Sequence, residues 1–366
     1  MKQYRPAYYK NFRCIASDCS DNCCIGWEID IDETTAAFYR SVGGDFGCRL
    51  QKNIHQDECG SHFTLNGERC PFLNEKNLCD IYINLGEDAL CEICTQHPRY
   101  HEWYGNWKES GVGLCCEAAG KLIFSQRETA FELVNIDEES GEPVDEELFS
   151  ALFIARETAF KLVLNPKLPF GQRLALLQDF ADELQEALDA EDPEGIRSIV
   201  QRYKLFNAVD ELPAGDSTAL SDSLDFLAQL EPIDPQWPAL LKEMQKNIPQ
   251  LCAAHEQLKT AYPNWLPEME QLAVYFLFRY FCKALFDGDV RSKTMVCSMA
   301  CLIVSLLDAE TFLRKGRFTL DDRIFTAKQF SKEIEYCTEN LDALYDYCWQ
   351  DEFSIFSQIS CIFPYS

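Results

Sequence analysis

Residues 14–24 read CIASDCSDNCC, so four cysteines occupy eleven consecutive positions. The gaps between neighbouring thiols are four residues, three residues and none. Such close packing of thiols has three possible explanations, which are disulfides, a bound metal, or coincidence. Both kinds of link stabilise a small domain that lacks a large core, so this stretch decides how the first part of the chain folds.

The other cysteines support a metal. Twelve of the 19 cysteines lie in the first 120 residues of this 366-residue chain. Two or three residues between thiols let both sulfurs reach one metal centre from a tight turn, and thiolate ligands select zinc or iron–sulfur clusters. Cys48 and Cys59 lie in an irregular segment and are not included among the predicted metal ligands. The predicted metal ligands are Cys14, Cys19, Cys23, Cys24, Cys70, Cys79, Cys91, Cys94, Cys115 and Cys116.

Disulfides fit the sequence less well. The N-terminus, MKQYRPAYYKNF, has neither the apolar segment nor the cleavage site of a signal peptide, so we expect a cytoplasmic protein. Disulfides are rare in that reducing compartment, and the number of cysteines is odd. The most apolar run, residues 294–307, is too short to span a bilayer, so we expect no membrane partner.

The spacing alone leaves zinc and iron–sulfur both open. Cys91-x2-Cys94-x2-His97 can supply mixed ligands to zinc. Ten cysteines exceed the four of one structural site, so either two centres exist or some thiols are spectators. Later cysteines such as Cys297 and Cys301, one helical turn apart on an apolar face, are expected to be core residues.

The net charge bounds the partners. It is −27, which disfavours nonspecific binding to nucleic acid and to anionic membranes. Residues 1–125 hold 18 acidic and 12 basic side chains, so most of the negative charge lies in the remainder. A cationic partner, such as a protein surface rich in lysine, is favoured.

Apolar periodicity predicts a mainly α-helical protein. Apolar residues recur at steps of three and four in residues 143–164, 170–190, 237–262 and 265–286. EESGEP (138–143) is the best linker candidate. We therefore predict a small cysteine-rich, metal-stabilised α+β domain over residues 1–140, followed by an acidic α-helical bundle over residues 141–366.

Two short β elements are expected in the first domain. GWEIDID (26–32) alternates apolar and polar residues, which indicates a strand. RYHEWYGNWKES (99–110) indicates a hairpin whose two-residue turn is Gly105-Asn106.

Several segments resemble one known family. The runs YRPAYYKNFRCIASDCSDNCCIGWEIDIDETT (4–35), ERCPFLNEKNLCDIYINLGEDALCEICTQHPR (68–99), GLCCEAA (113–119) and LFRYFCKALFDGD (277–289) resemble the flagellin lysine-N-methylase family. The cysteine-rich part is also similar to small zinc- or iron-chelating domains, in which a cysteine group ending in CC precedes C-x-F-L and C-x-I-Y. These motifs correspond here to residues 19–24, 70–73 and 79–82.

The resemblance implies an enzyme that methylates the ε-amino groups of flagellin lysines with S-adenosylmethionine as donor. It also implies an iron–sulfur cluster, of the 4Fe-4S type, rather than zinc. Cys19-x3-Cys23 begins the C-x3-C-x2-C pattern of radical S-adenosylmethionine enzymes, but position 26 is Gly. No G-x-G-x-x-G opens a βαβ unit, so a Rossmann-type donor site is not visible. The cluster then either anchors the donor or is structural.

Methyl transfer to lysine sets chemical requirements. The amine must be neutral to attack a sulfonium methyl, although its ordinary pKa is about 10.4. A tyrosine or carboxylate can take its proton, and aromatic faces attract both the lysine and the sulfonium. Residues 97–104, HPRYHEWY, lie between two cysteine pairs and offer such groups. No catalytic base is assigned; the predicted donor-binding residues are Trp27, Tyr100 and Trp103.

Two other functions remain open from the residues alone. The first is a zinc-stabilised module that binds a protein partner without chemistry. The second is a metal carrier or redox protein. Iron with acid-labile sulfide would favour the enzyme or the redox protein, and colourless zinc would favour the binding module.

Overall fold

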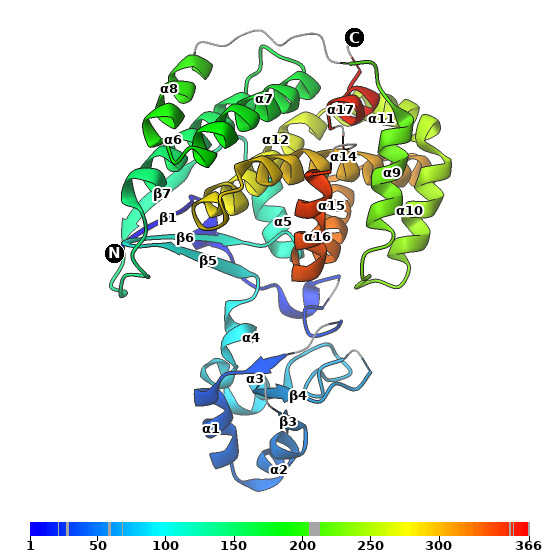
Figure 1. Ribbon diagram of the computed structural model, residues 1–366. Coiled ribbons are helices and arrows are strands. Elements are labelled where there is room, and N and C mark those ends of the chain that lie inside the picture. Colours follow the sequence, from blue (N-terminus) through cyan, green and yellow to red (C-terminus); the bar gives the residue numbers. More distant parts are fainter. Residues whose placement is uncertain are drawn as a thin grey trace.

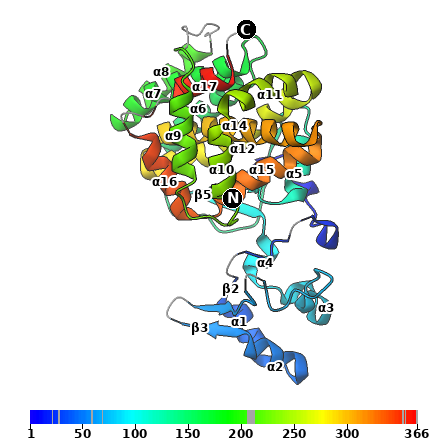
Figure 2. The same ribbon diagram turned by 90° about the vertical axis from the view of Figure 1, so that its right-hand side faces the viewer.

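The computed structural model describes residues 1–20, 22–26, 29–57, 60–67, 69–204, 213–350, 353 and 355–364. Figures 1 and 2 show two lobes of unequal size joined through a narrow region beside α4. The small lobe comprises the described part of residues 22–96. The large lobe comprises residues 1–12 and the described part of 97–364. Residues 13–20 form a junction segment between them.

The small lobe combines a short sheet with four helices. Its strands are antiparallel and lie in the order β2 (Asp30–Ile31), β4 (Ser61–Phe63), β3 (Ile54–Gln56). The helices are α1 (Glu33–Ser41), α2 (Gly44–Lys52), α3 (Asp80–Leu85) and α4 (Glu92–Gln96). Asp32 caps two of them, because its carboxylate accepts from the amides of Thr35 at 2.9 Å and Glu92 at 3.0 Å.

The small lobe has its own hydrophobic core, separate from that of the large lobe. Tyr39, Phe63 and Phe72 are almost fully buried in it, with their rings in contact. Cys70 and Cys91 are buried in the same core, and three further cysteines pack against it. Because this core is small, links through the thiols would add a large share of the lobe's stability.

The large lobe contains a four-stranded sheet in the order β5-β6-β1-β7. Its strands are β1 (Lys2–Pro6), β5 (Arg99–Tyr104), β6 (Trp107–Val112) and β7 (Phe131–Asn135). β1 runs parallel to β6 and antiparallel to β7. The predicted hairpin is confirmed: β5 pairs with β6 across Gly105-Asn106, and Gly105 has a φ of +58°.

Helices make up the rest of the large lobe. In chain order they are α5 (Glu117–Phe124), α6 (Glu146–Val163), α7 (Phe170–Asp189), α8 (Pro193–Tyr203), α9 (Ser217–Leu227), α10 (Trp237–Lys246), α11 (Ile248–Ala261), α12 (Trp265–Tyr280), α13 (Ala284–Asp287), α14 (Val290–Lys315), α15 (Leu320–Glu335), α16 (Thr338–Cys348) and α17 (Ile355–Ile362).

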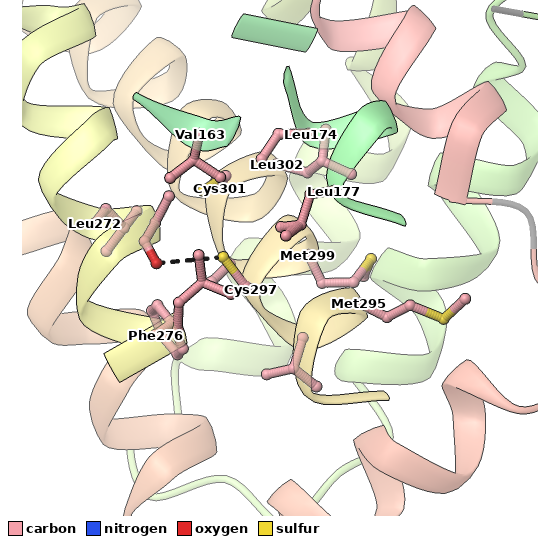
Figure 3. Close-up of a cluster of buried hydrophobic side chains, with 14 of the residues drawn as sticks. Val163, Leu174, Leu177, Leu272, Phe276, Met295, Cys297, Met299, Cys301 and Leu302 are labelled. Carbon is pink, nitrogen blue, oxygen red and sulfur yellow. Dashed lines mark hydrogen bonds between the residues drawn. The ribbon is translucent and has the colours of Figure 1, made fainter. Parts of the chain in front are cut away.

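Helix α14 runs through the centre of this bundle (Figures 1 and 3). Around it, side chains from α6, α7 and α12 form a continuous core, and the predicted core position of Cys297 and Cys301 is confirmed because both are fully buried. Figure 3 shows the Cys297 thiol donating to the carbonyl of Ala273 at 3.4 Å. These two thiols are therefore packing residues.

Helix α14 is also the one helix of the described residues that is long and apolar enough to cross a membrane by length and composition. The sequence expectation considered only residues 294–307, whereas the helix extends to 26 residues. Its most apolar window is 83% buried inside the fold. Burial among other helices accounts for its apolar composition, as in the core helix of a bundle.

Three expectations need correction at the level of elements. Residues 237–262 form two helices, because Pro249 lies in the first turn of α11 and cannot continue the helix before it. The helix expected over 265–286 ends at Tyr280 and is followed by a 3-10 turn and α13. The strand expected over 26–32 is described only as Asp30–Ile31, and Trp27 lies outside the described residues.

The predicted fold class is confirmed: the chain is mainly helical, with small sheets and most of its cysteines in the N-terminal part. The two lobes do not coincide with the ranges 1–140 and 141–366. Tyr104, Leu114 and Phe124 belong to the same hydrophobic cluster as the helices of the second half. The division near residue 140 stays a prediction about independently folding units.

Candidate metal centre and active-site cavity

Five of the ten predicted metal ligands gather in the small lobe. Cys70 and Cys91 are buried in its core, and Cys24, Cys79 and Cys94 pack against it. The Cys70 amide donates to the Cys24 carbonyl at 2.9 Å, which joins the first cysteine cluster to the C-x-F-L segment. The Cys91 and Cys94 sulfurs lie 3.4 Å apart. We call Cys24, Cys70, Cys79, Cys91 and Cys94 the thiol group.

Three of the predicted metal ligands lie at the N-terminus of a helix, where backbone amides can interact with a thiolate. Cys79, Cys91 and Cys116 are the N-cap residues of α3, α4 and α5. Burial raises the pKa of Cys79 and raises that of Cys116 to about 11, and hydrogen bonds from first-turn amides offset part of this rise. A helix start thus supplies partial positive charge to each of these thiolates.

Crowding works in the opposite direction. Burial raises the pKa of Cys70 to about 11. The hydrogen bond and charge of Cys91 raise the pKa of Cys94, and those of Cys23 raise the pKa of Cys24. Cys91, stabilised by its hydrogen bond with Cys94, has a lowered pKa. Thiols held together in this way ionise fully only when a cation joins them, as expected of a metal-binding donor set.

The spacing of the sulfurs bears on the kind of metal. In the part of the chain that the structure describes, no three cysteine sulfurs lie within 4.8 Å of one another. Four thiolates around one zinc, each about 2.3 Å from the metal, lie about 3.8 Å apart. The thiol group supplies thiolate donors suited to zinc or to an iron–sulfur cluster.

The other five predicted ligands are not part of the thiol group. Cys23 neighbours Cys24, and Cys19 and Cys23 are close enough to Cys116 to raise its pKa by their charge. Cys19 also contacts the Glu117 carboxylate at 3.8 Å. Cys14 is exposed.

Cys115 turns away from this edge into the large lobe. It is buried, and its sulfur lies 3.9 Å from Nε2 of His97 and close to the Tyr336 hydroxyl. The structure therefore places the CC pair of residues 115–116 between the thiol region and the interior of the large lobe.

Beside this segment the large lobe contains an open cavity of about 340 Å³ lined by many polar side chains, which we call the tyrosine cavity. Its wall comes from β5, the C-terminal end of α12, α13, α14, the end of α15 and α16. The lining residues are Tyr100, His101, Glu102, Arg279, Tyr280, Lys283, Asp287, Lys293, Glu335, Thr338, Leu341, Asp342 and Tyr345. The cavity thus joins the aromatic segment 97–104 to residues 277–289, one of the segments that carry the family resemblance.

A buried carboxylate organises one wall of the cavity. The Glu335 side chain is fully buried and pairs with Arg279 at 2.9 Å. Tyr275 and Tyr280 donate their hydroxyls to Glu335 Oε1 at 2.9 and 2.8 Å. The Leu114 amide donates to the Tyr275 hydroxyl at 3.2 Å, which connects this network to the segment carrying Cys115.

Aromatic rings complete the wall. The Arg279 guanidinium lies 4.5 Å from the centre of the Tyr100 ring, and the Lys293 ammonium lies 3.7 Å from that of Tyr345. Gly111 faces Tyr100 across the hairpin, and a Cβ there would collide with the tyrosine ring. Burial raises the pKa values of Tyr100 and Tyr280, so both phenols stay protonated at neutral pH.

The predicted donor-binding residues have different placements. Tyr100 lines the cavity. Trp103 is 39% exposed and packs on Gly141, with the Lys108 ammonium 4.9 Å from its ring, outside the cavity lining. Trp27 lies outside the described residues.

Sequence reasoning missed Arg279, Tyr280 and Glu335 as site residues. Arg279 and Tyr280 stand within LFRYFCKALFDGD, so the resemblance marked their segment without marking the residues. Glu335 carried no signal, because it is one of many acidic residues on amphipathic helices.

Comparisons with known proteins match a part of the chain that includes residues 277–289. The C-terminal domain family of the FliB lysine N-methylases matches residues 156–362, which include α12 to α16 of the cavity. Over 128 residues, 32% of this chain, it is 36% identical to the flagellar biosynthetic protein FliU of Salmonella muenchen, with 75% of that protein covered.

Two lysine-N-methylases, from Salmonella choleraesuis and Salmonella typhimurium, are each 35% identical over 128 residues. The match spans about a third of the length of these relatives, 31% in both cases. No solved structure matches the chain. Since the family match covers more than half of the sequence, the chain belongs to the FliB lysine N-methylase family.

Proposed function

We propose that this protein transfers methyl groups from S-adenosylmethionine to lysine side chains of flagellin, with the target lysine entering the tyrosine cavity. Membership of a lysine N-methylase family implies the reaction class. The FliU name of one relative connects the family with flagella. The observation that carries the proposal is the cavity itself, in which a buried carboxylate and tyrosines face one space.

The cavity suits a lysine chemically. Aromatic faces attract an ammonium group, as the position of Lys293 over Tyr345 illustrates. Glu335 is the buried carboxylate of the wall, and the Tyr280 hydroxyl donates to it. A proton released by the incoming ammonium can pass through Tyr280 to Glu335, which leaves a neutral amine.

The transfer then follows simple bond changes. The lone pair of the lysine nitrogen forms the new nitrogen–carbon bond with the methyl group. The carbon–sulfur bond breaks, and its electron pair stays on sulfur as S-adenosylhomocysteine. The remaining protein groups orient the amine and exclude water.

An iron–sulfur cluster fits the donor set of the small lobe. We propose that the thiol group holds it, because five thiols gather there and thiolates are the ligands that such clusters take. When bound, it supplies a cationic iron centre that stabilises the ionised thiolates and cross-links the small lobe. Either a structural or a donor-anchoring role is compatible with the position of Cys115 and Cys116 between this lobe and the cavity.

The test is methyl transfer from isotope-labelled S-adenosylmethionine to purified flagellin, read by mass spectrometry. Tyr280→Phe should lower kcat at least about tenfold, as loss of a proton relay does. The matched control is Tyr82→Phe, because Tyr82 is 52% exposed in the small lobe. Absence of labelled lysine with the parent enzyme, or equal rates for parent and Tyr280→Phe, would contradict the proposal.

A further inference from the structure

We propose that His55, Asp57 and His62 form a second metal site, for a divalent transition-metal ion such as Zn²⁺, on the small lobe. The site is distinct from the thiol group and uses nitrogen and oxygen donors. One ligand atom from each of the three side chains lies within 4.8 Å of the other two.

Strand register brings the two imidazoles together. His55 on β3 and His62 on β4 are directly paired, and their ring centres lie 5.0 Å apart. Side chains alternate between the faces of a sheet, so the flanking Ile54 and Phe63 point inward, and both pack in the lobe's core. The histidines therefore occupy the opposite, outer face, where His55 is exposed and His62 half-buried.

Hydrogen bonds between Asp57 and Gly60 hold the Asp57 carboxylate beside the two imidazoles. The Asp57 amide donates to the Gly60 carbonyl at 3.0 Å, and the Gly60 amide donates to Asp57 Oδ1 at 3.2 Å. The other oxygen, Oδ2, lies 3.9 Å from Nδ1 of His62. Gly60 has a φ of +135°, a conformation that favours glycine.

The donor set and its dimensions fit a transition metal. Zinc binds imidazole nitrogen and carboxylate oxygen at about 2.0–2.2 Å, so tetrahedral donors lie about 3.3 Å apart. The His62–Asp57 pair, at 3.9 Å, has to close by about half an ångström, and the other pairs, all within 4.8 Å, by at most about 1.5 Å, which rotation of the exposed His55 and Asp57 side chains can supply. Imidazole favours zinc, nickel and copper over magnesium and calcium. Three protein ligands leave one position open for water.

Such an ion would have a structural consequence. It would join β3 to β4 and hold the end of the hairpin. A ligand that binds only the folded state stabilises it. The small lobe, with its limited core, would gain most from this link.

The five histidines of the chain allow a direct test on the full-length protein as purified. The protein is prepared with isotope-labelled histidine, and Zn²⁺ is added while the ring signals are followed by NMR. The signals of His55 and His62 should shift, and those of His97, His101 and His255 should not. Zinc taken up by cysteines would leave the first two signals in place, so the readout separates the two kinds of site.

Variants complete the experiment. His62→Gln and Asp57→Asn should each weaken the Zn²⁺ affinity reported by the His55 signal at least about tenfold. Loss of a residue that only hydrogen-bonds a metal ligand already costs about tenfold in metal affinity, and loss of a ligand itself should cost at least as much. Asp45→Asn, which alters an exposed carboxylate on α2 of the same lobe, should leave it unchanged. Unshifted His55 and His62 signals in excess Zn²⁺, or equal affinity in all variants, would overturn the proposal.

Discussion

Arg279 Nη1 lies 2.9 Å from Glu335 Oε1, so the end of α12 is ion-paired with the last residue of α15. The pair forms part of the cavity wall and is shielded from solvent. Each of these two buried charges is stable in the interior only while the opposite charge of the other residue is present.

Glu335→Gln should therefore destabilise the fold by about 3 kcal/mol, because it leaves the Arg279 charge buried without its counter-ion. It should also abolish most methyl transfer. Thermal unfolding and the flagellin assay measure the two effects. Glu339→Gln, four residues along in the sequence and exposed, is the matched control. A Glu335→Gln variant as stable and active as the parent would contradict the role of this wall.

Gly113→Ala should destabilise the protein by about 1–3 kcal/mol, because the new Cβ would overlap the Tyr336 hydroxyl and lie 3.4 Å from the Cys115 sulfur. Gly43→Ala is the control, since no atom lies within 4 Å of its added Cβ and its φ of −93° suits alanine. Chemical denaturation compares the two. Equal stabilities would show that Tyr336 does not pack as described.

Glu109→Gln should cost about 3–5 kcal/mol of unfolding free energy. It leaves the buried Arg156 guanidinium without its counter-charge and replaces one of its two acceptor oxygens by an NH2 group. Glu183→Gln removes an exposed ion pair with Arg202 and should cost less than about 1 kcal/mol. Urea unfolding measures both free-energy losses. A loss for Glu109→Gln no larger than that for Glu183→Gln would contradict the prediction.

His97 should make the fold sensitive to acid. Burial, with a contribution from the Lys332 ammonium, lowers the pKa of His97 from 6.5 to about 4. The unfolded chain then binds more protons than the folded one, so stability rises with pH in this window. Full stabilisation is present above pH 6.5, and up to about 3 kcal/mol is lost as the pH falls to about 4.

The measurement is the unfolding free energy between pH 7 and pH 4. His97→Gln should reduce its pH dependence, and part of the slope should remain because burial also lowers the pKa values of His101 and His255. The same slope in His97→Gln as in the parent would show that this ring is not the titrating group.

Cys91→Ala should remove most of the bound iron and acid-labile sulfide from anaerobically purified protein, because Cys91 belongs to the thiol group, is buried in the core and lies 3.4 Å from the Cys94 sulfur. Cys48→Ala, an exposed thiol on α2 of the same lobe, should retain both. Metal analysis with sulfide determination distinguishes the variants. Full iron content in Cys91→Ala would exclude it as a ligand, and zinc without sulfide in the parent would contradict the cluster.

Local patterns in the sequence were sufficient for much of the fold. The Gly105-Asn106 turn predicted the β5–β6 hairpin, because a two-residue turn with a positive φ leaves few other arrangements. Apolar periodicity predicted α6 and α7 closely. The division of 237–262 at Pro249 was missed, because periodicity continues in register across a short break.

The sequence by itself determined that this protein would be a helical bundle with a thiol-rich N-terminal part, because periodicity and cysteine spacing are local properties. Only the tertiary structure decided which thiols gather in the small lobe and that Cys115 turns toward the cavity. It also brought Tyr100, Arg279 and Glu335 to one wall from three distant elements. Such meetings depend on how whole helices pack, and no local pattern records the packing partner of a residue.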